Sequence, residues 1–266
     1  MAGVDMKQKG WVWEGIGCDP ELLPTIYGVG EGVEYFGVTG ANYMFHPNNN
    51  VAMQKLSHVP QITADISKWI WFETKSETGR FAIGQSRDDN PETVMAEAAN
   101  VSRLSLEYPN LVAAFIDDTH GVATHANATP DAPIRIKEAL CQHNPDLDLW
   151  IVVYTHELDE PYWKDWMDAV DVINLWVWEY QNLVHLEEYL SRCHEIFPDK
   201  RVVMGVYIHD YPSQSPLPLD YLQIELDTIV RHLESGGLDG YNILGNCIID
   251  QHPAQAEFIR NFIQSH

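Results

Sequence analysis

Five apolar runs in the second half of the chain end in polar or aromatic residues. They read FIDDTH (115–120), VVYTHELD (152–159), NLWVWE (174–179), GVYIHD (205–210) and YNILGN (241–246). Carboxyl groups can exchange protons with a substrate or attack it, and the flat rings of tryptophan and tyrosine present broad apolar faces to a ligand. If the runs are parallel strands, their ends meet in one place, and this mixture of side chains suggests a pocket for carbohydrate chemistry.

The elements around these runs predict an α/β protein with one (β/α)8 TIM barrel covering residues 1–266. Apolar strands alternate with helical patterns, which is typical of a parallel sheet covered by helices. Strands are expected at 11–17, 41–45, 61–72, 111–118, 149–156, 170–179, 201–210 and 239–246. Eight strands favour a closed barrel, in which the active site lies at the C-terminal mouth. The polar stretch 73–90 is expected to be a long loop over that mouth.

Two aspartates end the fourth predicted strand and are the first candidates for catalysis. Because neighbouring residues of a strand point to opposite sides, only one of Asp117 and Asp118 is expected to face the barrel axis. Glycoside hydrolysis needs a second carboxyl group at about 5–5.5 Å for retention, or about 6.5–9.5 Å for inversion. Glu179 after strand six and Asp210 after strand seven are the candidate partners. Each of these carboxylates could instead cap the following helix.

The aromatic residues suggest how a sugar would be held. Nine tryptophans and 12 tyrosines are present, and Trp176 and Trp178 share strand parity with Asn174. A polar residue within a barrel strand is more easily satisfied near the axis than under the helices, so Trp178 is expected at the mouth with Glu179 turned aside. The predicted substrate-binding residues are Trp13, His46, Trp69, His120, Tyr154, His156, Trp176, Trp178, Tyr207, His209 and Asn246.

The histidines at strand ends leave a second type of enzyme open. Asp118-x-His120 and His209-Asp210 could supply ligands to a transition metal, since imidazole and carboxylate groups suit zinc, manganese or iron. However, the sequence has no His-x-His or His-Glu-x-x-His spacing. The sequence therefore predicts no metal site and no cofactor. A metal-dependent barrel enzyme, either a sugar isomerase or a hydrolase with His and Asp ligands, is the alternative.

Composition limits the partners of the protein. The formal net charge of the 266-residue chain is −23, and no Lys/Arg run is present, so nucleic acid is not an expected partner. No segment has the length of a membrane span, and residues 1–10 do not resemble a signal peptide. A soluble protein is expected, either cytoplasmic or a mature form that has lost its signal peptide. Its four cysteines, including Cys18, have no zinc-type spacing. A small molecule or oligosaccharide is the expected partner, and the oligomeric state is left open.

The order of strand ends resembles that of barrel glycoside hydrolases and glycosidase-like barrels. The resemblance rests on FIDD at strand four, NLWVWE at strand six and GVYIHDY at strand seven, and it covers about residues 111–246. It implies one catalytic carboxylate after strand four, at Asp117 or Asp118, and a partner at Glu179 or Asp210. Two family patterns are absent: the Asn-Glu pair on strand four, and the Asp-x-x-Asp-x-Asp-x-Glu run of chitinase-like barrels.

These observations predict a carbohydrate-active enzyme, a glycoside hydrolase that uses a pair of carboxylates at the mouth of an aromatic-lined barrel. One strand-four aspartate would be the nucleophile or general base. Glu179 or Asp210 would be the general acid, with its pKa raised by surrounding aromatic rings. A barrel that binds sugars without catalysis is a further alternative.

Overall fold

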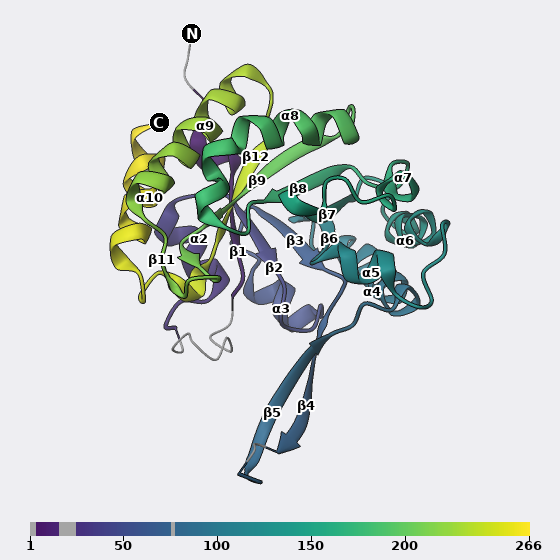
Figure 1. Ribbon diagram of the computed structural model, residues 1–266. Helices are drawn as coiled ribbons and strands as arrows, with labels where there is room; N and C mark the ends of the chain where they lie inside the picture. Colours follow the sequence, from purple (N-terminus) through teal and green to yellow (C-terminus); the bar gives the residue numbers. More distant parts are fainter. Residues whose placement is uncertain (1–3, 16–24, 76–77) are drawn as a thin grey trace.

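The computed structural model describes residues 4–15, 25–75 and 78–266 and contains a closed eight-stranded parallel barrel (Figure 1). Around the barrel the strands follow the order β1-β12-β9-β8-β7-β6-β3-β2. They are β1 (Gly10–Trp13), β2 (Gly40–Tyr43), β3 (Gln61–Asp65), β6 (Leu111–Ile116), β7 (Asp148–Tyr154), β8 (Val172–Trp176), β9 (Arg201–Tyr207) and β12 (Gly240–Leu244). This arrangement confirms the predicted α/β class and the (β/α)8 barrel.

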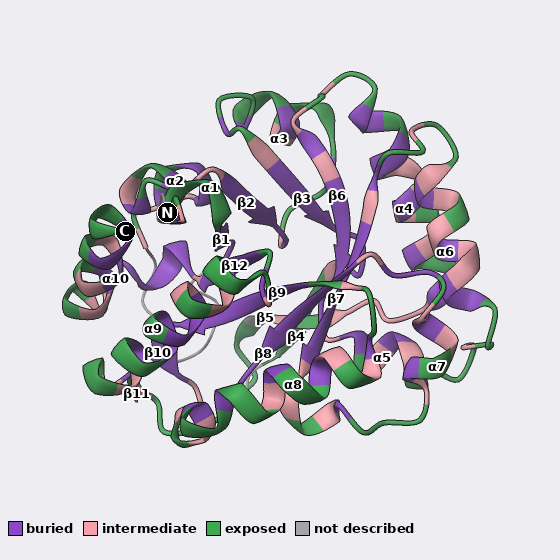
Figure 2. Ribbon diagram, turned by 90° about the horizontal axis from the view of Figure 1, so that it is seen from above, coloured by how far each residue is buried: buried purple, intermediate pink, exposed green. Residues whose placement is uncertain are grey.

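Helices surround the barrel on the outside (Figure 2). They are α1 (Met6–Lys9), α2 (Val29–Phe36), α3 (Asn50–Lys55), α4 (Pro91–Ser105), α5 (Thr119–Thr124), α6 (Ala132–Cys141), α7 (Trp163–Trp166), α8 (Leu186–Ile196), α9 (Leu219–Ser235) and α10 (Pro253–Ser265). Short 3-10 helices follow β7, β8 and β12 at Thr155–Glu157, Tyr180–His185 and Asn246–Ile248. None of the helices in the described ranges is long and apolar enough to cross a membrane.

Local sequence signals explain where the helices begin and end. The side chain of Asn90 accepts a hydrogen bond from the backbone N–H of Glu92, and Pro91 occupies the first turn of α4. Pro91 fits there because the first turn needs no backbone donor, while the cap satisfies one of the exposed N–H groups. At the other end of the barrel, α9 stops at Gly236, which has a φ of 80°. Glycine takes this left-handed conformation without a steric penalty.

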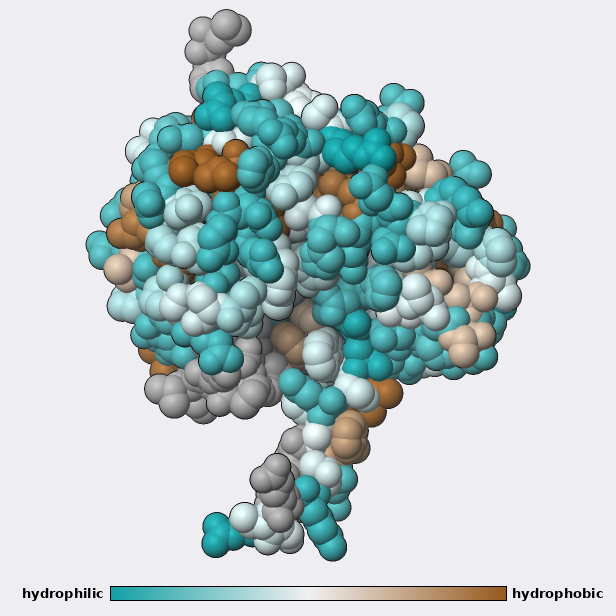
Figure 3. Space-filling model, viewed as in Figure 1, coloured by the Kyte–Doolittle hydropathy of each residue, from teal (hydrophilic) through white to brown (hydrophobic). Residues whose placement is uncertain are grey.

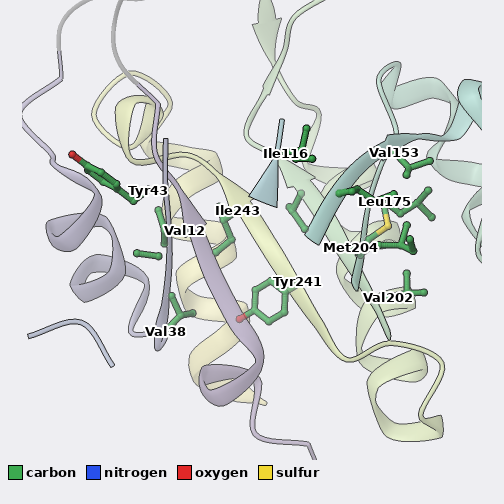
Figure 4. Close-up of a cluster of buried hydrophobic side chains, with 14 of the residues drawn as sticks. Val12, Val38, Tyr43, Ile116, Val153, Leu175, Val202, Met204, Tyr241 and Ile243 are labelled. Atoms are coloured by element: carbon green, nitrogen blue, oxygen red, sulfur yellow. The ribbon is translucent and has the colours of Figure 1, made fainter. Parts of the chain in front are cut away.

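Two apolar layers form the core, one on each side of the barrel wall. Strand residues that face outward pack against the helices, as in the cluster shown in Figure 4, which includes Val12, Ile116, Val153, Met204 and Ile243. The strand residues of opposite parity fill the interior. That interior cluster consists of Trp11, Trp13, Met44, Ala113, Phe115, Trp150, Val152, Val172, Trp176, Val203 and Tyr207.

Glycines on neighbouring strands make room for the large interior rings. A Cβ atom on Gly205 would lie 2.1 Å from the indole of Trp176, and one on Gly40 would lie 2.1 Å from the indole of Trp11. Both indoles therefore occupy space that any other residue on the adjacent strand would fill. Asn174 is fully buried in the strand that carries Trp176, which agrees with its predicted position toward the axis.

The region after β3 differs most from the prediction. The expected strand 61–72 ends at Asp65, and the expected loop 73–90 contains strand residues at 73–75 and 81–87. Instead, β4 (Trp69–Lys75) and β5 (Phe81–Arg87) form an antiparallel hairpin that projects from the barrel (Figure 1). The strand breaks because the Asp65 carboxylate accepts hydrogen bonds from both the backbone N–H and the hydroxyl of Ser67, which turns the chain.

Smaller differences occur at other strand ends. The predicted seventh strand, 201–210, leaves the barrel after Tyr207, and β10 (His209–Asp210) pairs with β11 (Ser215–Pro216) in a separate two-stranded sheet. The final residues of the first predicted strand and Cys18 lie outside the described residues. Cys193 is buried on α8, and burial raises the pKa of its thiol to about 12.

Candidate active site

The C-terminal mouth of the barrel contains a cavity with a volume of about 380 Å³. Residues from five barrel strands, from turns that follow strands and from the hairpin surround it. The lining consists of Trp13, Glu14, Gly15, Met44, Phe45, Trp69, Gln85, Asp117, Asp118, Val152, Tyr154, Trp176, Trp178, Tyr207, Tyr211, Leu244 and Cys247. Three carboxyl groups and seven tryptophan or tyrosine rings are therefore present in one cavity.

Both strand-four aspartates line this cavity, so the prediction that only one would face the axis is wrong. The alternation of side chains ends with β6 at Ile116. Asp117 is held by its backbone N–H, which donates to the hydroxyl of Ser67 at 3.0 Å. Asp118 has φ 41° and ψ 60°, a left-handed conformation that aspartate tolerates better than most residues. This local turn brings the second carboxyl group to the same cavity as the first.

Arg87, the last residue of β5, contacts both carboxyl groups. Its Nη1 atom lies 2.5 Å from Asp118 Oδ2 and 3.4 Å from Asp117 Oδ2, while its Nε donates to Asp89 Oδ1 at 2.7 Å. Because one nitrogen touches both aspartates, their carboxyl groups lie close together. Burial opposes the charge on Arg87, but the charges of Asp117 and Asp118 outweigh it and hold the arginine pKa above its ordinary value.

The two aspartates have different surroundings. Asp117 is buried, and this burial, together with the charge of Asp118, raises its pKa well above the ordinary value, while Arg87 lowers it in part. Asp118 is more exposed, and its Oδ1 accepts a hydrogen bond from the hydroxyl of Tyr154 at 2.7 Å. Both oxygens of Asp118 thus contact donors, which is the arrangement that a carboxylate prefers. The raised pKa favours the protonated form of Asp117, whereas the oxygens of Asp118 are held by Arg87 and Tyr154.

Aromatic rings form the floor and walls of the cavity. On the floor, Trp176 packs against Trp13 and Tyr207, with ring centroids 5.5 Å and 4.8 Å apart. At the rim, Trp178 stacks on Tyr211 with ring planes 9° apart, and it is 39% exposed. Trp178 therefore lies at the mouth, as its strand parity predicts. Burial raises the pKa values of Tyr154 and Tyr207 well above the ordinary value, so both hydroxyls stay protonated as hydrogen-bond donors.

Glu14 is the third carboxyl group in the cavity, but its oxygens are already occupied. Oε2 accepts from the backbone N–H groups of Met44 and Phe45, at 2.7 Å and 3.0 Å. Oε1 lies 2.9 Å from Nδ1 of His46, and this hydrogen bond raises the pKa of the histidine. These contacts join β1 to the segment after β2. Glu14 therefore fixes the shape of this side of the mouth.

The two predicted carboxylate partners lie outside the cavity lining. Glu179 is exposed and accepts a hydrogen bond from Asn182 at 3.3 Å. Asp210 is buried in a neighbouring crevice, where its Oδ2 accepts from the backbone N–H and the hydroxyl of Ser213. The crevice also contains Glu225 from α9. In this structure the aspartate pair at 117 and 118, rather than a pair from two strands, is assembled in the cavity.

The predicted substrate-binding residues divide into two groups. Those that line the cavity are Trp13, Trp69, Tyr154, Trp176, Trp178 and Tyr207; those that do not are His46, His120, His156, His209 and Asn246. His156 stacks on the ring of Tyr154, and His209 Nδ1 lies 2.8 Å from His252 Nε2. Asn246 accepts from the backbone N–H of Gly15 and donates to the carbonyl of Tyr27. His120 is exposed, and its Nδ1 lies 3.0 Å from the hydroxyl of Tyr162.

Several residues at the cavity were not among the predicted site residues. Arg87 and Gln85 belong to a segment that was expected to be a loop, and Tyr211 follows the strand end by one residue. The sequence did contain one signal. In the run FAIGQSR at 81–87, Arg87 is the one cationic residue. Within residues 4–15, 25–75 and 78–266, no group of three or more His, Cys, Asp or Glu side chains is arranged to hold a metal ion.

Known structures share this fold. The β-D-glucuronidase of Dictyoglomus thermophilum is 13% identical over 89% of this chain, with a TM-score of 0.57, and this chain spans 46% of its length. The glycoside hydrolase domain of PgaB (BpsB) from Bordetella bronchiseptica is 10% identical, with 96% of this chain and 99% of that domain covered and a TM-score of 0.54. A family 18 chitinase from Crocus vernus is 12% identical, with 96% and 98% covered and a TM-score of 0.53.

Similarity at the level of sequence is weaker. No family model matches the chain, and no curated protein sequence matches it. The structural matches therefore establish the fold: the chain is a TIM-barrel protein similar in architecture to glycoside hydrolases of several families.

Proposed function

We propose that the protein is a glycoside hydrolase in which Asp117 and Asp118 are the catalytic pair. The observation that carries the proposal is their shared contact with Arg87 Nη1 in a cavity lined by aromatic rings. Most barrel glycosidases flank the scissile bond with two carboxyl groups, one protonated and one ionised. The fold shared with glycoside hydrolases adds to this proposal but does not by itself assign the activity.

The environments of the two aspartates suggest their roles. Asp117, with its raised pKa, would donate a proton to the oxygen of the leaving group as the glycosidic bond breaks. Asp118 would attack the anomeric carbon and form a glycosyl ester. Asp117, then ionised, would take a proton from water, whose oxygen displaces Asp118 and releases the sugar. The closely spaced carboxyl groups favour this retaining course, for which the typical gap is about 5–5.5 Å. Glu179 and Asp210 are not needed in this scheme.

The aromatic residues would bind the sugar. Trp178 and Tyr211 offer ring faces at the rim, and the hydroxyl oxygen of Tyr154, whose proton is donated to Asp118, can accept a hydrogen bond from a sugar hydroxyl. A cavity of about 380 Å³ is within the size range of small-molecule sites and suits one or two sugar units. The substrate would be a neutral saccharide, since a chain with net charge −23 and three carboxyl groups in the cavity disfavours a polyanion.

A panel of neutral aryl glycosides in both anomeric configurations tests the proposal. Hydrolysis of at least one substrate is expected, with release of the same anomer as the substrate, measured by proton NMR during the first turnovers. Asp118→Asn should lower the rate by about 10²–10⁴-fold. Glu179→Gln and Asp210→Asn serve as comparisons, and full activity in Asp118→Asn and Asp117→Asn would show that the assignment is wrong.

One observation favours a second candidate, a barrel that binds saccharides without hydrolysing them. Arg87 forms an ion pair with Asp118, and a carboxylate engaged in this way is a weaker nucleophile than a free one. Saccharide binding in calorimetry, without turnover of any glycoside in the panel, would support this candidate over the hydrolase.

A further inference from the structure

The hairpin of β4 and β5 carries an unusual amount of exposed apolar surface. It projects from the barrel next to the mouth (Figure 1), and brown atoms in Figure 3 mark hydrophobic residues where it joins the barrel. Ile70, Trp71, Phe72 and Phe81 are all exposed, by 39% to 69%. Exposed aromatic and aliphatic side chains gathered on one element commonly mark a binding surface.

The register of the hairpin assigns these residues to two faces. Trp69 pairs with Arg87, and Trp71 pairs with Gln85. Directly opposed residues of an antiparallel pair share a face, so these four side chains lie on the same side of the hairpin. Ile70 and Phe72 lie on the other side, where the ring of Phe72 covers Gly84: a Cβ atom on that glycine would lie 2.4 Å from the ring.

The first of these faces is continuous with the cavity. Trp69 and Gln85 both line the cavity, and Arg87 contacts the two aspartates. Trp71 stands directly opposite Gln85 and two residues beyond Trp69, which is about 6.8 Å along a strand. The next exposed ring outward from the cavity is therefore that of Trp71, on the same surface.

Contacts at the base hold this face in position. The ring of Trp69 packs on Phe45 with centroids 5.6 Å apart, and the guanidinium of Arg87 lies 6.0 Å from the centre of the Trp69 ring. The backbone N–H of Asp88 donates to the carbonyl of Lys68 at 2.9 Å, which closes the hairpin at its root. A ligand that spans the cavity and the hairpin would thus meet a prearranged surface, which lowers the entropic cost of binding.

We propose that the hairpin face formed by Trp71 and Gln85 is a distal subsite for a neutral oligosaccharide whose reactive end occupies the cavity. The inference rests on the proposed function and specifies its substrate class as a chain of several sugar units. An exposed indole can stack on the apolar face of a sugar ring, and an amide can exchange hydrogen bonds with hydroxyl groups. Glu73, on the same face of β4, disfavours an anionic chain.

The experiment compares the affinities of short and long chains. Cello-, xylo-, manno- and chito-oligosaccharides of two and six units are titrated by calorimetry into full-length protein carrying Asp118→Asn, which prevents turnover. At least one hexasaccharide should bind more tightly than its disaccharide. Trp71→Ala should lower the ratio of the two affinities about three- to tenfold, as expected for the loss of one stacking contact. Trp71→Tyr should restore most of the ratio.

Ile70→Ala is the matched control, because Ile70 is exposed on the opposite face of the same strand. It should leave both affinities unchanged. The parent here is the Asp118→Asn protein without a hairpin substitution. The subsite would be overturned if the parent shows no preference for hexasaccharides over disaccharides, or if Trp71→Ala leaves the ratio of these two affinities unchanged. A dimer of the parent in sedimentation that Trp71→Ala abolishes would also overturn it, since a second copy of the chain would then cover this face.

The binding and hydrolysis experiments together distinguish a failure of the subsite proposal from a failure of the proposed activity. If a Trp71-dependent preference for long chains appears but the wild-type protein hydrolyses no glycoside, the subsite is supported and the proposed activity is not. If aryl glycosides are hydrolysed without any effect of Trp71→Ala on chain-length preference, the activity is supported and the subsite is overturned.

Discussion

Arg87 Nη1 lies 2.5 Å from Oδ2 of Asp118, so the last residue of the hairpin is ion-paired to a residue at the end of a barrel strand. The same nitrogen lies 3.4 Å from Asp117 Oδ2. These contacts link an arm that projects into solvent to the carboxyl groups at the mouth. Arg87 therefore has a positioning role, because it contacts and orients both carboxyl groups. Its charge also lowers the pKa of Asp117.

Replacement of Arg87 should change the pH profile as well as the rate. Arg87 lowers the pKa of Asp117, so Arg87→Met should raise it further. If Asp117 is the proton donor, activity falls as pH rises through this pKa, and the alkaline limb of kcat/KM should move to higher pH. The rate should fall about tenfold or more, since the aspartates lose their common partner. Arg87→Lys should preserve part of both properties because it keeps the charge.

The control for this variant is Arg135→Met. Arg135 forms an exposed ion pair with Glu92, and neither residue lines the cavity. It should leave the pH profile unchanged. A drop in rate for Arg87→Met without any movement of the alkaline limb would indicate that Arg87 only maintains the local structure.

The separate roles of the aspartates predict different responses to the leaving group. Asp117→Asn removes the proton donor, so hydrolysis of alkyl glycosides should fall about 10²–10⁴-fold. The loss should be much smaller for dinitrophenyl glycosides, whose leaving group departs without a proton. Asp118→Asn removes the nucleophile and should slow both substrates similarly. The measurement is kcat/KM of each variant for an alkyl glycoside and for a dinitrophenyl glycoside of the same sugar. Equal losses for Asp117→Asn on both would contradict its assignment as the acid.

The barrel could be predicted because its signals are local. Each strand is a short apolar run, and the caps and stops of the helices, such as Asn90 and Gly236, belong to the same segments. The positions of Trp176 and Trp178 followed from strand parity and the polarity of Asn174. These features depend on residues close in sequence, which explains why the fold and much of the aromatic lining were found.

The hairpin and the carboxylate pair could not be predicted for a different reason. The apolar residues at 69–72 continue the third strand without a visible break, and the described side chains of the hairpin are exposed or half-buried, so they show no alternation between a buried and an exposed face. The turn depends on the bonds between Asp65 and Ser67, and the inward direction of Asp118 depends on a left-handed backbone. Arg87 reaches the aspartates across 30 residues of sequence, a contact that periodicity does not reveal.

A buried carboxyl group outside the cavity predicts a pH dependence of stability. Glu225 on α9 is 1% exposed, and its Oε2 has no hydrogen-bond partner among the described residues. Burial raises its pKa well above the ordinary value of 4.5. The unfolded chain therefore releases this proton at a lower pH than the folded protein does. As pH rises above about 4.5, this group should progressively favour unfolding.

Glu225→Gln removes this titration. The variant should be more stable than the wild type at pH 8 by about 1–3 kcal/mol, with a smaller difference at pH 5, measured by urea unfolding. Glu234→Gln is the matched control, because Glu234 is exposed on the same helix. If the advantage of Glu225→Gln over this control is equal at pH 5 and pH 8, the carboxyl group does not titrate in this way.

Close contact between Gly205 and Trp176 predicts that the cavity floor tolerates no added atom. A Cβ atom on Gly205 would lie 2.1 Å from the indole, and the ring is enclosed by Trp13 and Tyr207. Gly205→Ala should therefore destabilise the protein by about 1–3 kcal/mol through overpacking. Differential scanning calorimetry should show a lower Tm.

The structure also predicts the direction in which Gly205→Ala would displace the indole of Trp176. Outward movement is blocked by the strand itself, so Trp176 should move into the cavity, and Gly205→Ala should weaken saccharide binding as well as stability. The double variant Gly205→Ala/Trp176→Phe tests this, because the smaller ring leaves room for the added methyl group. It should recover part of the Tm relative to Gly205→Ala alone. A double variant that is less stable than either single variant would mean that the two residues do not compete for the same space.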